Sequence, residues 1–112
     1  MKYVLMFVET EAFAKELEAM SALELEAAYD AVGRWFAEHS DKITHHTRLD
    51  PMHTATTVRL GGGEPVVTDG PFVEGKEVVS GFAEIEVADL DEALKMVSTW
   101  PACPLLEIRP FS

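Results

Sequence analysis

Four histidines lie close together in the sequence: His39, His45, His46 and His53. Imidazole is a common metal ligand and a common proton carrier near neutral pH. His45 and His46 are neighbours on an expected strand, so their side chains should point to opposite faces and not share one metal ion. No H-x-H or H-E-x-x-H spacing is present. The pattern favours ordinary histidines over a metal site, and it leaves His46 as a candidate acid or base.

Asp69 is the second residue that could do chemistry, in the stretch TDGPFVEGKE. An aspartate before Gly-Pro can accept a downstream backbone amide and fix a turn, with Phe72 anchoring the corner in the core. Gly70 precedes a proline and is therefore expected to be extended. The functional alternative is a carboxylate at a strand end that faces a cavity and works as a base or ligand acceptor.

Arg48 should share a sheet face with His46, because the two residues are two positions apart on the same expected strand. An arginine on a sheet face can fork onto a carboxylate ligand, or it can pair with a glutamate across the sheet. Glu84 should share its face with Phe82, where a covering partner would require the carboxylate to be paired or protonated. The candidate catalytic residues are therefore His46 and Asp69, and the candidate ligand-binding residues are Arg48, Phe72 and Glu84.

No residue pattern predicts a metal or a cofactor. The single cysteine, Cys103, excludes a disulfide within the chain and a multi-cysteine metal site, and no base lies near it in the sequence. The three glycines Gly61–Gly63 lack the Lys-Ser/Thr and the helix start of a phosphate loop. The aromatic residues Tyr29, Trp35 and Trp100 are expected in the core rather than at a cofactor.

Composition places limits on the function. The chain has 112 residues, expected to form one domain over 1–112, with a formal net charge of −11. Lysine and arginine are not clustered, so nucleic acid and anionic membrane surfaces are not expected partners. The apolar run YVLMFV is far shorter than the roughly 20 residues of a membrane helix, and no signal peptide opens the chain. A cytoplasmic location is expected.

The elements that must position these residues alternate between strands and helices. Period-two patterns predict strands, three- and four-residue spacing of apolar residues predicts helices, and Gly61–Gly63 mark a hairpin turn. Ser21 with Glu24 forms a capping box, and Asp89 with Glu92 caps the last helix, whose core stripe should be Leu90, Ala93, Leu94 and Val97. The expected strands are 2–9, 42–49, 54–60, 66–69, 78–87 and 105–111, and the helices are 10–20, 21–39 and 89–100.

This order predicts an α+β fold, the ferredoxin-like split βαβ pattern with an inserted β-hairpin. Two main helices can cover only one face of the sheet. The first strand is nevertheless apolar on both faces, with Tyr3, Leu5 and Phe7 opposite Val4, Met6 and Val8. A second copy of the chain is the simplest cover for the other face, so we expect a homodimer whose sheets pack face to face.

The stretch TDGPFVEGKEVVSGFAEIEVADLDEAL, residues 68–94, resembles the signature of DGPF-domain proteins, a branch of the YCII-related superfamily. The opening KYVLMFVE, the strand TATTVRL and the closing LLEIRPF fall in the order of that family. The resemblance implies a dimeric α/β barrel of the ferredoxin-like type. It implies no particular reaction, and it implies a regulatory protein, such as an extracytoplasmic-function sigma factor, as a candidate partner.

The chain departs from the superfamily at two places. YciI-like members carry a proposed catalytic pair, a histidine in the first helix and an aspartate before a proline after the second helix. Here the first main helix has no histidine before His39, and Trp100 precedes Pro101. That pair is absent. His45, His46 and Arg48 also stand where DGPF members favour small residues.

The expected function is the binding of a small organic molecule in a pocket between helix and sheet or at the dimer face. Any reaction should be cofactor-independent proton transfer, isomerisation or lyase chemistry, with His46 as acid or base, Asp69 as its partner and Arg48 holding an anion. The alternative is a non-catalytic accessory or sensor module that partners a transcription regulator.

Overall fold

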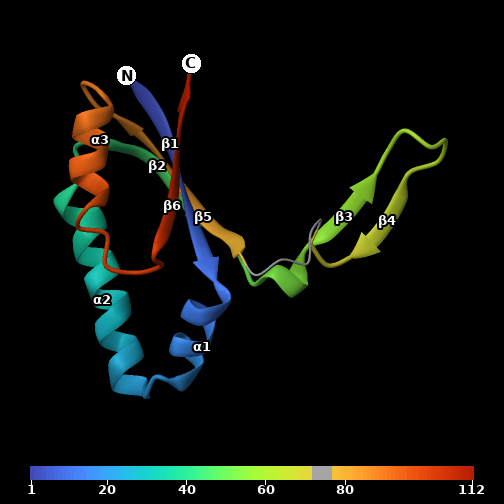
Figure 1. Ribbon diagram of the computed structural model, residues 1–112, viewed down its shortest axis with the longest axis horizontal. Helices are drawn as coiled ribbons and strands as arrows, with labels where there is room; N and C mark the ends of the chain where they lie inside the picture. The colour runs from blue at the N-terminus through green and yellow to red at the C-terminus, as the bar shows by residue number, and fades with distance from the viewer. Residues whose placement is uncertain (72–76) are drawn as a thin grey trace.

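The computed structural model describes residues 1–71 and 77–112, which form a body of helices on a sheet and a hairpin that projects from it (Figure 1). The body sheet is antiparallel and has the order β2-β5-β1-β6. Its strands are β1 (Lys2–Thr10), β2 (Ile43–Arg48), β5 (Glu77–Glu86) and β6 (Leu105–Phe111). This is the ferredoxin-like order, so the predicted α+β fold is confirmed.

The helices begin where the sequence supplies side-chain caps. They are α1 (Glu11–Ala19), α2 (Ala22–Glu38) and α3 (Leu90–Val97), with a short 3₁₀ helix η1 (Met52–Thr54). The predicted capping box is present, since Ser21 Oγ accepts from the Glu24 amide and the Ser21 amide donates to the Glu24 carboxylate, each at 3.2 Å. Asp89 caps α3 by accepting from the Glu92 amide at 2.9 Å. Within the described residues, no helix combines the length and apolarity needed to cross a membrane.

The hydrophobic core lies between the sheet and the helices. Its buried residues from the sheet strands are Tyr3, Leu5, Phe7, Ala83 and Ile85. Trp35 joins α2 to the C-terminal end of α3, because its indole N–H donates to the Met96 carbonyl at 3.2 Å and to Thr99 Oγ1 at 3.1 Å.

The predicted stripe of α3 was partly wrong. Ala93 is buried and Val97 packs against the core, but Leu90 and Leu94 are 47% and 48% exposed. Met96 is buried in their place. The helix is therefore rotated so that Met96, whose flexible side chain fills irregular gaps, faces the sheet.

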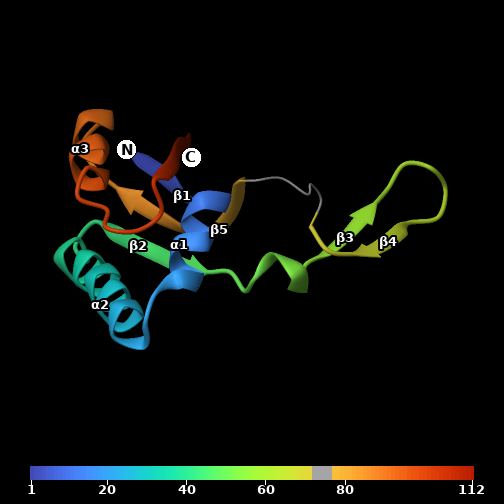
Figure 2. The ribbon, with the colours of Figure 1, turned by 60° about the horizontal axis from the view of Figure 1, so that its bottom comes forward.

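Among the residues that the structure describes, no helix lies on one face of the sheet. Helices α2 and α3 lie together on the other side, as both views show (Figures 1 and 2). On the uncovered face Val4, Met6 and Phe82 are half-buried, and they stand next to Glu84 and His45.

A bulge in β2 sets which residues face the helices. The pairing with β5 shifts between Ile43 and His45, so Ile43 packs on the core while His45 pairs with Glu84 on the uncovered face. Beyond the bulge His46 is opposite Ala83 and Arg48 is opposite Gly81, on the helix side. The regular period-two pattern of the strand expected over 42–49 would place Ile43 on the face of His45, and this is wrong because the bulge adds one residue to β2.

The hairpin is a separate two-stranded sheet, β3 (Thr56–Arg59) paired with β4 (Val66–Asp69), and we call residues 56–69 the arm. The predicted hairpin is thus confirmed. Gly70 at its base has φ +100°, so the predicted extended geometry is wrong and the position uses the freedom of glycine. The arm raises the radius of gyration to 16.2 Å, against about 13 Å for a compact chain of this length.

Candidate functional site

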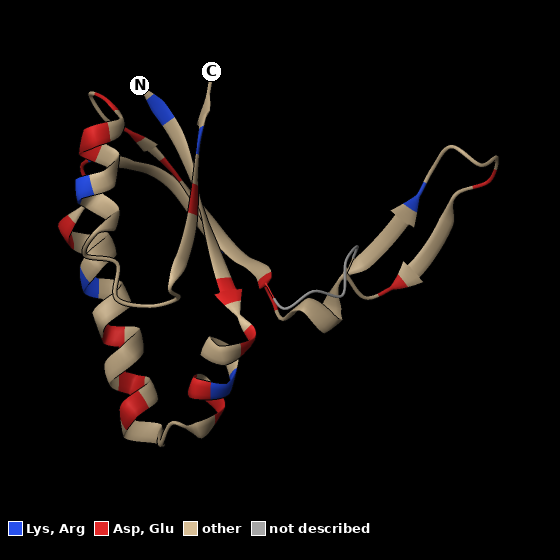
Figure 3. Ribbon diagram, viewed as in Figure 1, with Lys and Arg blue, Asp and Glu red and all other residues tan. Residues whose placement is uncertain are grey.

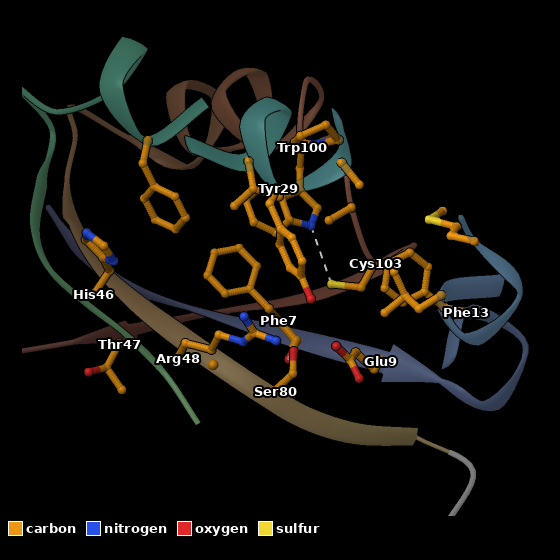
Figure 4. A pocket seen from close by; sticks show the side chains of 18 residues that line it. Phe7, Glu9, Phe13, Tyr29, His46, Thr47, Arg48, Ser80, Trp100 and Cys103 are labelled. Atoms are coloured by element: carbon orange, nitrogen blue, oxygen red, sulfur yellow. Dashed lines mark hydrogen bonds between the residues drawn. The ribbon is translucent and has the colours of Figure 1, made fainter. Parts of the chain in front are cut away.

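A cavity of about 200 Å³ opens on the helix side of the sheet (Figure 4). Its walls come from α1, from α2, from the middle of the sheet and from the loop that follows α3. Gly81 of β5 is one of the lining residues and adds no side chain to the cavity. An alanine Cβ at this position would lie 2.7 Å from the Thr47 carbonyl oxygen, so β2 and β5 approach closely only because this residue is glycine.

Five of the residues that line the cavity are Phe, Tyr or Trp. Phe7 and Trp100 stack with their ring centroids 4.3 Å apart, and Phe36 meets both edge to face. The remaining aromatic wall residues are Phe13 and Tyr29. Such a lining binds flat apolar molecules and disfavours ions that have no polar partner.

The side chains of His46 and Arg48, both from β2, lie at one side of the cavity. The His46 ring stacks on Phe36 with the centroids 4.3 Å apart. The Arg48 guanidinium lies 5.4 Å from the centre of the Tyr29 ring, a cation–π arrangement. None of the ion pairs among the described residues includes Arg48, and Figure 4 shows its side chain reaching across the cavity. Arg48 is thus placed to accept an anion.

The opposite side of the cavity holds the buried thiol of Cys103. The Trp100 indole N–H donates to its sulfur at 3.4 Å, and Figure 4 places Glu9 close by. Burial raises the pKa of the Cys103 thiol, the Trp100 hydrogen bond opposes this shift, and the negative charge of Glu9 adds to it. The thiol is therefore protonated at neutral pH and is not an activated nucleophile.

We expect the Cys103 thiol to ionise at higher pH in the folded chain than in the urea-denatured chain. Because the folded pKa is raised, the stabilising contribution is complete below the unfolded pKa and is lost as the pH rises through the folded pKa. The ultraviolet absorbance of the thiolate, followed against pH with Cys103→Ser subtracted to remove the tyrosines, measures this shift. A thiolate already formed in the folded chain at neutral pH would contradict the prediction.

The structure separates the residues that the sequence singled out. His46 and Arg48 both line the cavity, as their two-residue spacing predicted. Asp69 does not join them, because it ends β4 in the arm and pairs with Thr56 there. Glu84 lies on the uncovered face of the sheet, opposite His45. Phe72 lies outside the described residues.

Three residues that line the cavity were not predicted as site residues from the sequence. Tyr29 was expected in the core, but it is 51% exposed and its ring lies beside Arg48. Glu9 and Ser80 also line the cavity, from the end of β1 and from β5. Only the predicted fold could have indicated Glu9 and Ser80 as site residues. In a ferredoxin-like sheet β1 and β5 are antiparallel neighbours, so the end of β1 lies beside the beginning of β5.

No three His, Cys, Asp or Glu side chains within residues 1–71 and 77–112 are grouped closely enough to hold a metal ion. His45 and His46 lie on opposite faces of the sheet. What the site offers is an apolar slot with an arginine, an imidazole, a phenol and a carboxylate at its edge. That set can bind and orient a small polar ring compound and move a proton on it.

Comparison with known proteins places this chain in a family. A YCII-related domain matches residues 1–107. The uncharacterised protein R00369 of Rhizobium meliloti (strain 1021) is 36% identical over 107 residues, which cover 92% of this chain and 82% of that protein. The chain therefore belongs to the YCII-related family, as the sequence predicted.

A solved structure shares the fold. It is 5-chloro-2-hydroxyhydroquinone dehydrochlorinase (TftG) from Burkholderia phenoliruptrix AC1100 in complex with 2,5-dihydroxybenzoquinone. The likeness has a TM-score of 0.57 at 13% identity and covers 100% of this chain and 94% of that one. It shows a common architecture, including the ferredoxin-like sheet.

Proposed function

We propose that the cavity binds a small organic anion built on a single ring. The observation that carries this proposal is the position of Arg48, which has no carboxylate partner among the described residues and lies beside a cavity walled by aromatic rings. A guanidinium forks onto the oxygens of a carboxylate or phenolate, while the rings pack on the body of the ligand.

The size of the cavity fits this class of ligand. A cavity of about 150 Å³ is enough to hold benzene, and this one measures about 200 Å³. It has room for a ring with a few small substituents. The structural neighbour TftG supports the class, since its bound 2,5-dihydroxybenzoquinone is a single ring with ionisable hydroxyl groups.

The proposed chemistry is cofactor-independent proton transfer on the bound ring. His46 is the acid or base, because an imidazole can donate and accept a proton near neutral pH and this one lies on the cavity edge. Arg48 holds the anion and stabilises negative charge that develops on its oxygens. Asp69 has no part in this site within one chain. A cytoplasmic location remains a prediction.

Binding is tested by calorimetric titration with 2,5-dihydroxybenzoquinone, benzoate and its neutral analogue benzamide. We expect the anions to bind and benzamide to bind much more weakly. Removal of a charge-assisted hydrogen bond costs about 1.5–3 kcal/mol, so Arg48→Ala should weaken anion binding by about tenfold to a hundredfold. Equal affinities for benzoate and benzamide would contradict the proposal that the ligand is an anion. An Arg48→Ala variant that binds benzoate as tightly as the wild type would contradict it as well.

The role of His46 is tested against its neighbour in the chain. His46→Ala removes the imidazole at the cavity, and His45→Ala removes one from the opposite face of the same strand. Deuterium incorporation into the bound ring, followed by NMR in deuterated water, should be lost in the first variant and kept in the second. If the wild type binds the ring but incorporates no deuterium, the catalytic role of His46 is excluded and the cavity is a binding site for a sensor.

The uncovered sheet face supports a further part of the proposal, a homodimer whose sheets pack face to face. Val4, Met6 and Phe82 form the apolar centre of that face and are only half-buried within one chain. A second copy would bury them and would also cover Glu84 and His45, whose pairing in the sheet places them side by side.

A further inference from the structure

The arm has one apolar face. In an antiparallel pair, residues opposite each other point to the same side, so Val58 and Val67 share a face and Leu60 follows two positions after Val58. These three side chains are 51%, 61% and 75% exposed. The other face carries Thr57, Arg59, Val66 and Thr68, while Thr56 and Asp69 end the first face at the base of the arm. The arm thus carries an exposed apolar patch, Val58, Leu60 and Val67, on one face of the hairpin.

The arm receives little support from its own body. Strand β3 packs extensively on β4, and the other elements of the described chain make at most marginal contact with either strand. A two-stranded hairpin alone is marginally stable in water, and exposed strand edges are open to pairing with another chain. A hairpin with apolar side chains and two open edges is expected to be covered in the working protein.

The position of the arm indicates what covers it. Helices α2 and α3 lie on one side of the sheet and the arm projects on the other, so the arm and the uncovered face point the same way (Figures 1 and 2). A hollow of about 590 Å³ lies between the base of the arm and the start of β5, and its lining combines apolar residues such as Met52, Val58 and Val79 with the polar residues Asp50 and Thr56. The arm and the adjacent end of the sheet thus enclose one concave corner.

We propose that the arm packs against a second copy of the chain, with Val58, Leu60 and Val67 buried at the contact. The inference rests on the face-to-face pairing proposed above, because a copy seated on the uncovered face lies beside the arm. Twofold symmetry then buries both arms in equivalent positions. The arm carries three charged residues, Arg59, Glu64 and Asp69, with a formal net charge of −1 against −11 for the whole chain, so it adds little to the repulsion between two acidic chains (Figure 3).

The test is the association state of three variants, measured by sedimentation equilibrium over micromolar concentrations. Val67→Asp places a carboxylate on the apolar face of the arm. Thr68→Asp adds the same charge one position later on the opposite face of the arm. Phe82→Glu places a carboxylate at the centre of the sheet contact. Circular dichroism checks that each variant is folded, which is expected because none of the three residues is fully buried.

We expect the wild type at twice the chain mass of 12.4 kDa. Val67→Asp should weaken the dimer at least about tenfold, since a buried unpaired charge is costly, while Thr68→Asp should match the wild type. A dimer that Phe82→Glu disrupts and Val67→Asp leaves unchanged would overturn the role of the arm and keep the sheet pairing. Disruption by Val67→Asp alone would keep the arm contact and overturn the sheet pairing. A monomeric wild type would overturn both.

Discussion

Replacement of Trp35 by alanine is expected to lower the free energy of unfolding by about 3–5 kcal/mol, a large part of the stability of a small domain. Trp35 is 2% exposed and packs edge to face on Phe7 and Trp100. Its indole N–H also links α2 to the C-terminal end of α3 through Met96 and Thr99. The substitution therefore opens a cavity at the centre of the core and removes the indole hydrogen bonds between α2 and the C-terminal end of α3.

Two variants of α2, Trp35→Phe and Leu23→Ala, separate the loss of the hydrogen bonds from the loss of core packing when unfolding by urea is measured. Trp35→Phe keeps an aromatic ring but loses the indole N–H. Its loss of unfolding free energy should be smaller than that of Trp35→Ala, because the Met96 carbonyl still accepts a hydrogen bond from Thr99 Oγ1. Leu23→Ala changes a residue of the same helix that is 78% exposed, and it should alter stability by less than about 0.5 kcal/mol. A loss in Leu23→Ala as large as in Trp35→Ala would show that the helix, and not the core contact, dominates.

Gly81→Ala is expected to cost about 1–3 kcal/mol and to disturb the cavity at the same time. The added Cβ would lie 2.7 Å from the Thr47 carbonyl oxygen and 3.5 Å from the Arg48 Cα. These are backbone atoms, so they cannot rotate away and β2 must move. Because β2 carries His46 and Arg48, the same shift should weaken binding of benzoate as well as lower the midpoint of urea unfolding.

The control for Gly81 is another glycine, Gly33, in the middle of α2. An alanine Cβ there meets no atom within 4 Å, and alanine favours the helix over glycine by about 1 kcal/mol. Gly33→Ala should therefore raise stability and leave ligand binding unchanged. If Gly81→Ala were as stable as the wild type, the close approach of β2 and β5 would not constrain that residue.

The sequence predicted the order of the elements because its signals are local, but the helix predicted over 89–100 ends at Val97 and the strand predicted over 54–60 spans Thr56–Arg59. Alternating apolar residues in strand 2–9 and the Ser21–Glu24 box each need only a few neighbouring residues to be recognised. The bulge between Ile43 and His45 has no such signal, because it arises from pairing with β5. The orientation of α3 likewise depends on packing, so Leu94 was predicted inside where Met96 lies.

The site was predictable only in part. The spacing of His46 and Arg48 placed them on one face, and both line the cavity. Asp69 was joined to them by residue type alone, and no local pattern shows that its strand leaves the body sheet. Cys103 and Glu9 lie almost the full length of the chain apart and meet only after β1 pairs with β6, so no window of sequence connects them.

The base of the arm has a consequence for chain entropy. The Leu49 amide donates to the Ser80 carbonyl at 2.9 Å, so β2 and β5 are still paired where the chain leaves the body and where it returns. Closing a loop of about thirty residues instead of a four-residue turn costs roughly 2 kcal/mol of conformational entropy. Within the described part of the chain, the strands of the arm make at most marginal contact with the body, so burial there offsets little of this loss. The arm therefore resembles an insertion between β2 and β5, two strands that pair with each other in the body sheet without any contribution from the arm.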